Sequence, residues 1–433
     1  MNSFQIPPTI RRNVLQSVVA MFITATGMLT LPYRSVSGQE GRASTSDAEV
    51  LNGIDVLVKD SFKQLDGRRV GLITNHTGIN RNWVSTVKLL NDSDKVQLIS
   101  LFSPEHGFEG KLDIARINDA RDSKTGLKIH SLYGKTRTPT AEMLKGIDTL
   151  VFDIQDIGTR FYTYISTMGN AMKAASQNGI RFVVLDRPNP VNGIDVQGPV
   201  LDKGSESFVG YHSIAVRHGM TAGELARMFN EEMKLNLELE VVRMKGWERN
   251  SYFDETGLPW VNPSPNMRCL NQAILYPGIG LLEMTNLSVG RGTDTPFEVV
   301  GAPYIDGVKL ARRMNASGLN GVRFVPIRFT PVSSKFKGDQ CGGINIIITD
   351  REKLQPIKLG FQLAVVLRQL NPDEWKTDQL NRLLSSQKCL DGLVQKMAVE
   401  KIESRYRSEL DDFAKRRKKF LLYPESQSIT PAK

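Results

Sequence analysis

The chain has 433 residues, of which 40% are hydrophobic, and a formal net charge of +10. This length and composition exclude a disordered chain and favour a globular protein of two or three domains. The three cysteines, Cys269, Cys341 and Cys389, have no paired metal-ligand spacing, so the sequence predicts no zinc site.

The first residues have the layout of a removable export signal. Arg11 and Arg12 precede a mostly apolar stretch from Val14 to Leu31, and small residues follow before Gln39. We therefore predict an export signal at residues 1–38, a linker at 39–52, and a mature protein that is periplasmic or extracellular. A permanent membrane anchor is the alternative, although polar residues interrupt the apolar stretch.

The mature chain remains basic, which bears on its partners. The basic run "KRRKK" at residues 415–419 contains no interleaved aromatic residue, so it predicts the solvated face of a C-terminal helix and no nucleic-acid site. A mildly basic surface suits an acidic polymer such as cell wall.

From residue 69 onward, short apolar runs alternate with helical patterns. The runs at 69–74, 96–102, 149–154 and 181–186 predict buried strands, because β-branched and aromatic residues follow one another without polar alternation. The segments at 83–91 and 161–179 predict helices. This alternation predicts a Rossmann-like α/β domain with a doubly wound, mostly parallel sheet.

The predicted first domain, residues 53–249, closes with a helix and an edge strand. Thr221 and Glu224 have the spacing of a capping box, which predicts a helix that continues to Met233, and the alternation at 235–242 predicts the strand. From residue 250, Pro- and Gly-rich loops lead into a smaller α+β auxiliary domain at 250–423. It contains a predicted strand at 342–350, helices at 357–370 and near the C-terminus, and is followed by a tail at 424–433.

Polar, turn-forming clusters follow the four predicted strands, at residues 75–78, 103–110, 155–164 and 186–193. The carboxyl ends of parallel strands face one crevice, so these clusters are expected to meet there. Each cluster alone also has a structural explanation, such as a helix cap, a local ion pair or core aromatic residues. Their shared position favours a functional site.

The chemistry of these clusters fits a carbohydrate better than a nucleotide. The sequence lacks a G-x-G-x-x-G or P-loop fingerprint after the first strand, and it lacks a G-x-S-x-G elbow. Acids can transfer protons, amides and tyrosine can bind hydroxyls, and arginine can grip a carboxylate. This mixture of side chains therefore predicts a polyhydroxylated ligand that is neutral apart from one negatively charged group.

Glu105 is the first candidate for the acid, because it follows Pro104 directly after a strand. Glu109 lies further along the same loop between glycines. The structural alternative for Glu105 is a turn carboxylate that is paired with His106 or caps the next segment.

Eight motifs in order resemble the NamZ-type exo-β-N-acetylmuramidases: "GLITNHTG", "SPEHGFEG", "VFDIQDIGTRFYTY", "VLDRPNPVNG", "RHGMTAGELA", "NPSPNM", "YPG" and "NLSVGRGTDTPFEVVGAPYID". The resemblance extends from about Gly53 to about Tyr423. It implies a Rossmann-like domain followed by an auxiliary domain, with the active site in the cleft that they share. It also implies removal of terminal N-acetylmuramic acid from the non-reducing end of peptidoglycan fragments, with no cofactor.

The motifs and the strand ends together supply the candidate site residues. The catalytic candidates are Glu105, Asp153, Asp156 and Glu283. The candidates for substrate binding are Asn75, His76, His106, Gln155, Arg160, Tyr162, Arg187, Asn189, His218, Asn262, Asn266, Asn286, Arg291 and Asp294. The lactyl ether of N-acetylmuramic acid carries a carboxylate, and we predict that Arg160 first and Arg291 second bind it.

The leading hypothesis is an exported glycosidase that acts on peptidoglycan fragments without a metal or cofactor. A non-catalytic wall-binding protein could use the same cleft. A carbohydrate esterase or amidase is a further alternative, against which the missing serine elbow and zinc ligands count.

Overall fold

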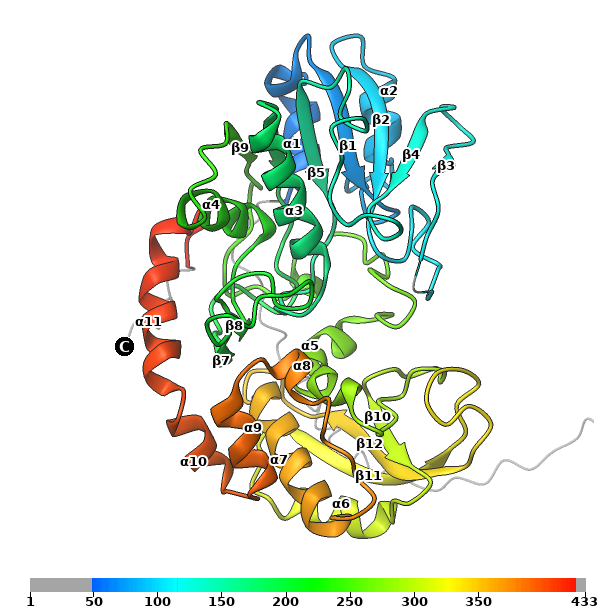
Figure 1. Ribbon diagram of the computed structural model, residues 1–433, viewed down its shortest axis with the longest axis vertical. Coiled ribbons are helices and arrows are strands. Elements are labelled where there is room, and N and C mark those ends of the chain that lie inside the picture. Colours follow the sequence, from blue (N-terminus) through cyan, green and yellow to red (C-terminus); the bar gives the residue numbers. More distant parts are fainter. Residues whose placement is uncertain (1–48, 115, 426–433) are drawn as a thin grey trace, which may run out of the picture. The chain divides into compact units, whose positions relative to one another are not determined.

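The first domain is built on a seven-stranded sheet in the order β3-β4-β2-β1-β5-β6-β9 (Figure 1). Neighbouring strands pair in parallel except β3, which is antiparallel to β4. The bounds are β1 (Arg69–Thr74), β2 (Gln97–Ser103), β3 (Ala120–Arg121), β4 (Lys128–Ser131), β5 (Thr149–Asp153), β6 (Arg181–Leu185) and β9 (Leu239–Val242). This computed structural model describes residues 49–114 and 116–425. The predicted export signal, most of the predicted linker and most of the predicted tail lie outside the described residues.

Both faces of the sheet are buried, which explains the continuous apolar runs of its strands. Along β5 and β6, Phe152 and Phe182 belong to one core cluster, whereas Val151 and Val183 belong to the other. Helices α1 (Gly53–Lys59) and α2 (Thr86–Asn91) contribute to the valine side, and α3 (Tyr164–Gln177) and α4 (Ala222–Glu232) contribute to the phenylalanine side. The predicted doubly wound fold is therefore confirmed.

The long elements of the first domain agree with the sequence patterns within a few residues. The capping box is present: the Thr221 hydroxyl accepts from the backbone N–H of Glu224, and the Glu224 carboxylate accepts from the backbone N–H of Thr221. The strand expected at the sheet edge is β9. The short strands β3 and β4 and the hairpin of β7 (Gln197–Val200) and β8 (Ala215–Arg217) were not predicted, since two to four residues give no readable run.

The second domain has an antiparallel sheet in the order β10-β12-β11 and a set of helices, as the predicted α+β class requires. Its elements are α5 (Leu270–Ile279), β10 (Val299–Ala302), α6 (Gly307–Asn315), β11 (Val322–Phe329), β12 (Cys341–Ile348), α7 (Pro356–Leu370), α8 (Asn381–Leu384), α9 (Gln387–Val394), α10 (Val399–Ser404) and α11 (Arg407–Arg417). The predicted strand at 342–350 and helix at 357–370 are β12 and α7. Pro326 lies in β11, at the sheet edge, where a residue without an N–H is tolerated.

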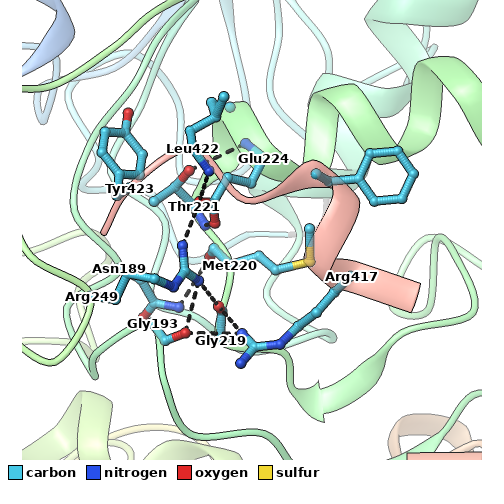
Figure 2. A network of polar contacts seen from close by, with 12 residues as sticks. Asn189, Gly193, Gly219, Met220, Thr221, Glu224, Arg249, Arg417, Leu422 and Tyr423 are labelled. Atoms are coloured by element: carbon cyan, nitrogen blue, oxygen red, sulfur yellow. Dashed lines mark hydrogen bonds and ion pairs between the residues drawn. The ribbon is translucent and has the colours of Figure 1, made fainter. Parts of the chain in front are cut away.

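The C-terminal segment returns to the first domain. Helix α11 contacts β7, and the turn that follows it contacts α4 (Figure 1). Figure 2 shows the resulting network: the Arg417 guanidinium donates to the carbonyl of Gly193, and the Leu422 N–H donates to the Glu224 carboxylate. The Tyr423 hydroxyl donates to Asp186 over 2.6 Å. The last residues of the predicted auxiliary domain thus pack on the first domain.

Replacing Tyr423 with Phe is expected to lower the free energy of unfolding by about 1–3 kcal/mol, because the buried Asp186 carboxylate loses a donor. Urea denaturation measures this change. The matched control is Tyr406→Phe: Tyr406 is also buried, and its hydroxyl forms no hydrogen bond with a described residue, so its removal should cost little. Equal losses in the two variants would contradict the role given to the Tyr423 hydroxyl.

Candidate active site

A cavity of about 340 Å³ lies at the carboxyl end of the sheet and is lined by residues of both domains. The first domain contributes the segments that follow β2, β4 and β5 and a short stretch near residue 208, and the second domain contributes residues around α5, Arg291 and α8. The lining residues with polar or charged groups are Glu105, His106, Asp113, Tyr133, Arg137, Tyr162, Thr163, Tyr164, Ser207, Ser264, Asn266, Tyr276, Glu283, Arg291 and Arg382.

A tight turn presents Glu105 to this cavity. Pro104 ends the β2 strand region, and its carbonyl accepts from the Gly107 N–H over 3.1 Å. His106 and Gly107 both have a positive φ, of 68° and 74°, so the chain reverses directly after Glu105. The Thr163 hydroxyl donates to the Glu105 carboxylate. The stretch is therefore a turn, and this turn holds the carboxylate at the cavity.

Tyrosine side chains surround Glu105. Burial is the main cause that raises the pKa of Tyr133, and the charge of Glu105 adds to the shift, which brings the pKa to about 12. Burial also raises the pKa of Tyr164 and of Tyr276, and the charge of Glu105 contributes to both shifts. All three tyrosines are therefore neutral at physiological pH, and the Tyr164 hydroxyl donates to the carbonyl of Pro263.

Two further carboxylates of the cavity share one arginine. Glu283, in the 3-10 turn Gly280–Met284, forms an ion pair with Arg291. Arg291 also donates to both oxygens of Asp113 over 2.7 Å. Burial opposes the charge of Asp113, but the Arg291 bond lowers its pKa overall. Arg291 is thus engaged by two acids, and it links the loop after β2 to the second domain.

Aromatic rings form one wall of the cavity. The Tyr276 ring is tilted against Phe161 and lies edge-on to Phe297, with ring centroids 5.1 and 4.7 Å away, and Tyr162 lies edge-on to Tyr164 at 4.9 Å. Such rings offer an apolar surface with hydroxyl groups at its margin, which suits the C–H face of a sugar ring.

The structure does not bring Asp153 and Arg187 to the cavity. The Arg187 guanidinium donates to Asp153 over 2.5 and 3.0 Å, and the Thr86 hydroxyl donates to the same carboxylate. Both side chains are buried between the ends of β1, β5 and β6. Because each neutralises the other, this pair stabilises the fold beside the cavity.

Arg160, the first choice as the carboxylate-binding residue, is also outside the cavity lining. Its guanidinium is fully buried and donates to four backbone carbonyls, those of Pro199, Ile214, Leu383 and Leu384, over 2.7 to 3.1 Å. Arg160 therefore joins the first domain to α8 of the second, and both of its terminal NH2 groups are used within the protein.

Asp156 and His218 form a buried pair behind the cavity. The His218 Nε2 lies 3.9 Å from the Asp156 carboxylate, and neither Nε2 nor the Asp156 Oδ1 has a hydrogen-bond partner among the described residues. Burial raises the pKa of Asp156 to about 7 and lowers the pKa of His218 to about 3. At neutral pH His218 is therefore uncharged, and Asp156 is protonated in part of the molecules. Neither residue lines the cavity.

The remaining candidates divide between the cavity and the scaffold. His106, Tyr162 and Asn266 line the cavity, and Asn266 donates to Asp113 over 3.3 Å. Those that do not line it are Asn75, His76, Gln155, Asn189, Asn262, Asn286 and Asp294. Most of these hold backbone groups in place: Gln155 bonds two carbonyls, His76 contacts the Asn262 carbonyl over 2.7 Å, and Asn286 bonds the backbone at Glu374. Asp294 is fully exposed.

Several cavity residues were missed by the analysis of strand ends. Thr163, Tyr164 and Tyr276 lie within motifs that were recognised, and their position next to named candidates was the available signal. Asp113, Tyr133, Arg137 and Arg382 lie outside those motifs, and no local pattern in the sequence distinguishes them.

Within residues 49–114 and 116–425, no three His, Cys, Asp or Glu side chains gather into a group that could hold a metal ion. No helix in this part of the chain is long and apolar enough to cross a membrane. Cys269, Cys341 and Cys389 are free thiols.

Several carboxylates beside aromatic rings in one cavity of an α/β chain suit the chemistry of a glycoside hydrolase. Comparison with known proteins gives the family. The models for the N-terminal and C-terminal domains of the exo-β-N-acetylmuramidase NamZ match residues 70–271 and 274–423. The chain belongs to the NamZ family.

Individual relatives agree with this assignment. The chain is 42% identical to the peptidoglycan β-N-acetylmuramidase NamZ of Bacillus subtilis (strain 168) over 414 residues, which cover 94% of this chain and 100% of the relative. Crystal structures of two DUF1343 family proteins from Bacteroides fragilis NCTC 9343 have the same fold. The match to the first has a TM-score of 0.81 at 39% sequence identity and covers 87% of this chain and 99% of the Bacteroides chain. The other has a TM-score of 0.70 at 30% identity, with coverage of 87% and 100%.

The Asp156 carboxyl predicts a pH-dependent stability. Its pKa in the folded protein, about 7, lies above the usual value of 3.8, so the folded state holds a proton that the unfolded chain releases between these values. The resulting stabilisation is complete below about pH 4 and is lost as the pH rises through 7. Asp156→Asn stays neutral and avoids this loss.

Relative to wild type, the Asp156→Asn variant is expected to gain stability on the order of 4 kcal/mol between pH 4 and pH 8. Urea denaturation of both proteins across this range measures the difference. Stability curves that run parallel over the whole range would contradict a buried, protonated Asp156.

Proposed function

We propose that the protein is an exo-acting glycosidase that removes terminal N-acetylmuramic acid from the non-reducing end of peptidoglycan fragments, in cell-wall turnover or recycling. The observation that carries this proposal is the presentation of Glu105, by a tight turn, to a cavity that Glu283 and Asp113 also line. The names of the matching family and of the Bacillus subtilis relative support the choice of substrate.

The size of the cavity supports action at a chain end. Its volume of about 340 Å³ is near the lower end of the range for ligand pockets. A space of this size suits one terminal sugar better than a run of several. An enzyme that cuts inside a glycan strand would need a longer groove.

The reaction requires a proton on the leaving oxygen while the sugar becomes oxocarbenium-like. Glu105 is suited to give this proton, because it is held by the Thr163 hydroxyl and lies next to Tyr133, without an arginine partner among the described residues. Glu283 or Asp113 then acts as base, as nucleophile or as the group that orients the sugar's acetamido substituent. Arg291 forms an ion pair with each of these carboxylates.

Replacing Glu105 with Gln is expected to lower kcat on the natural disaccharide by about 10²- to 10⁴-fold, because the leaving oxygen loses its proton donor. On an aryl glycoside with a good leaving group the loss should be much smaller. The control is Glu109→Gln, an exposed carboxylate of the same loop that does not line the cavity, which should retain activity on both substrates.

The outcomes of this experiment separate the alternatives. Equal losses on both substrates would remove Glu105 from the acid role. A wall-binding protein would have no turnover to lose and would keep its affinity in the variant. An esterase or amidase would release acetate or lactate where a glycosidase releases sugar.

We further propose that the protein is exported and acts in the periplasm or outside the cell, on the basis of the N-terminal pattern of residues 1–38. The small residues Val36 and Gly38 suit a signal peptidase. N-terminal sequencing of protein recovered from the exported fraction is expected to begin after residue 38. A sequence that begins at Met1 would contradict cleavage.

A further inference from the structure

The charges around the cavity leave two arginines without a carboxylate partner. The lining contains Arg137, Arg291 and Arg382, and Arg291 is paired with Asp113 and Glu283. Among the described residues, neither Arg137 nor Arg382 has an ion-pair partner. A cavity with two uncompensated guanidinium groups is suited to an anionic ligand group.

Arg137 is held in a fixed position. Its guanidinium lies over the ring of Phe208, 4.2 Å from the centroid, and over the ring of Tyr133, 5.3 Å from the centroid. The Asn170 side chain of α3 donates to its backbone carbonyl over 3.2 Å. Stacking covers the faces of a guanidinium and leaves its N–H edge available, which is the geometry that binds a carboxylate through two parallel hydrogen bonds.

Tyr133 connects this arginine to the candidate acid. The Arg137 guanidinium lies over its ring, and Tyr133 and Glu105 line the same cavity, close enough for the charge of Glu105 to raise the pKa of Tyr133. The N–H edge of Arg137 and the carboxyl group of Glu105 are therefore separated by about the length of one aromatic side chain, that of Tyr133. One sugar residue can contact both, with its glycosidic oxygen at Glu105 and a substituent of its ring at Arg137.

We propose that Arg137 determines specificity by binding the lactyl carboxylate of a terminal N-acetylmuramic acid. This inference rests on the proposed function and adds the residue that recognises the acidic substituent. Arg137 and Arg382 are both exposed, but Arg382 lies on the short helix α8 and has no aromatic ring stacked on it among the described residues, so Arg137 is the better ordered of the two for this role. Arg137 thus replaces Arg160 and Arg291, the residues predicted from the sequence, as the proposed contact of the carboxylate.

The test compares two aryl glycosides that differ in one group: N-acetylmuramic acid and its lactyl amide, in which the carboxylate is neutral. Wild type should prefer the acid. Arg137→Ala should lower kcat/KM for the acid by about 10- to 150-fold, the range of a charge-assisted hydrogen bond, and leave kcat/KM for the amide nearly unchanged. Arg137→Lys should restore part of the preference, since it keeps the charge without the planar fork.

Arg312→Ala is the matched control, because Arg312 is exposed on α6 and does not line the cavity. It should keep the wild-type preference. The proposal is overturned if Arg137→Ala lowers both substrates equally, which indicates a structural role, or if it leaves the preference intact. It is also overturned if Arg382→Ala alone abolishes the preference.

Binding measurements keep this test separate from the proposed function. Calorimetry on the Glu105→Gln variant with free N-acetylmuramic acid and N-acetylglucosamine needs no turnover. Tighter binding of the acid, lost on adding Arg137→Ala, supports the carboxylate contact even if the wild-type enzyme hydrolyses neither glycoside, a result that would defeat only the proposed reaction. Equal affinities for the two sugars in the Glu105→Gln variant would overturn the contact itself.

Discussion

The buried guanidinium of Arg160 is the contact on which the arrangement of the cavity depends. It bonds carbonyls of the β7–β8 region on one side and of α8 on the other. The residues that follow Arg160, from Phe161 to Tyr164, line the cavity, and so does Leu383. The Arg160 side chain therefore fixes the relative positions of cavity walls that are formed by segments distant in the sequence. A guanidinium is suited to this because its N–H donors diverge in a plane from a single carbon.

The acids of the cavity are distinguished by their partners. Asp113 and Glu283 share Arg291, whereas Glu105 is held by a threonine hydroxyl. An arginine favours the ionised form of a carboxylate much more strongly than a neutral hydroxyl does. The structure thus separates two acids that are paired with a guanidinium from one that is not. This separation is the electrostatic condition for two carboxylates to play different parts in one reaction.

The fold was largely predictable from the sequence, and the site only in part. The runs that form β1, β5 and β6 are readable because both faces of the sheet are buried. Reading the polar residues that follow each strand placed Glu105 and Asp153 at strand ends. The sequence pattern does not indicate that Arg187, 34 residues away, neutralises Asp153. Pairing between distant side chains has no local signature, and the same gap explains why Arg137 was missed and Arg160 was preferred.

The return of the C-terminal segment to the first domain imposes an order on biosynthesis. Asp186 and Glu224 are buried in the first domain, yet Tyr423 and the Leu422 N–H, which bond them, leave the ribosome after nearly all of the second domain. A nascent chain that ends earlier has two buried carboxylates that lack these donors, so its core is incompletely stabilised. Completion of the first domain is therefore postponed until the second domain has been translated, and the two domains mature together.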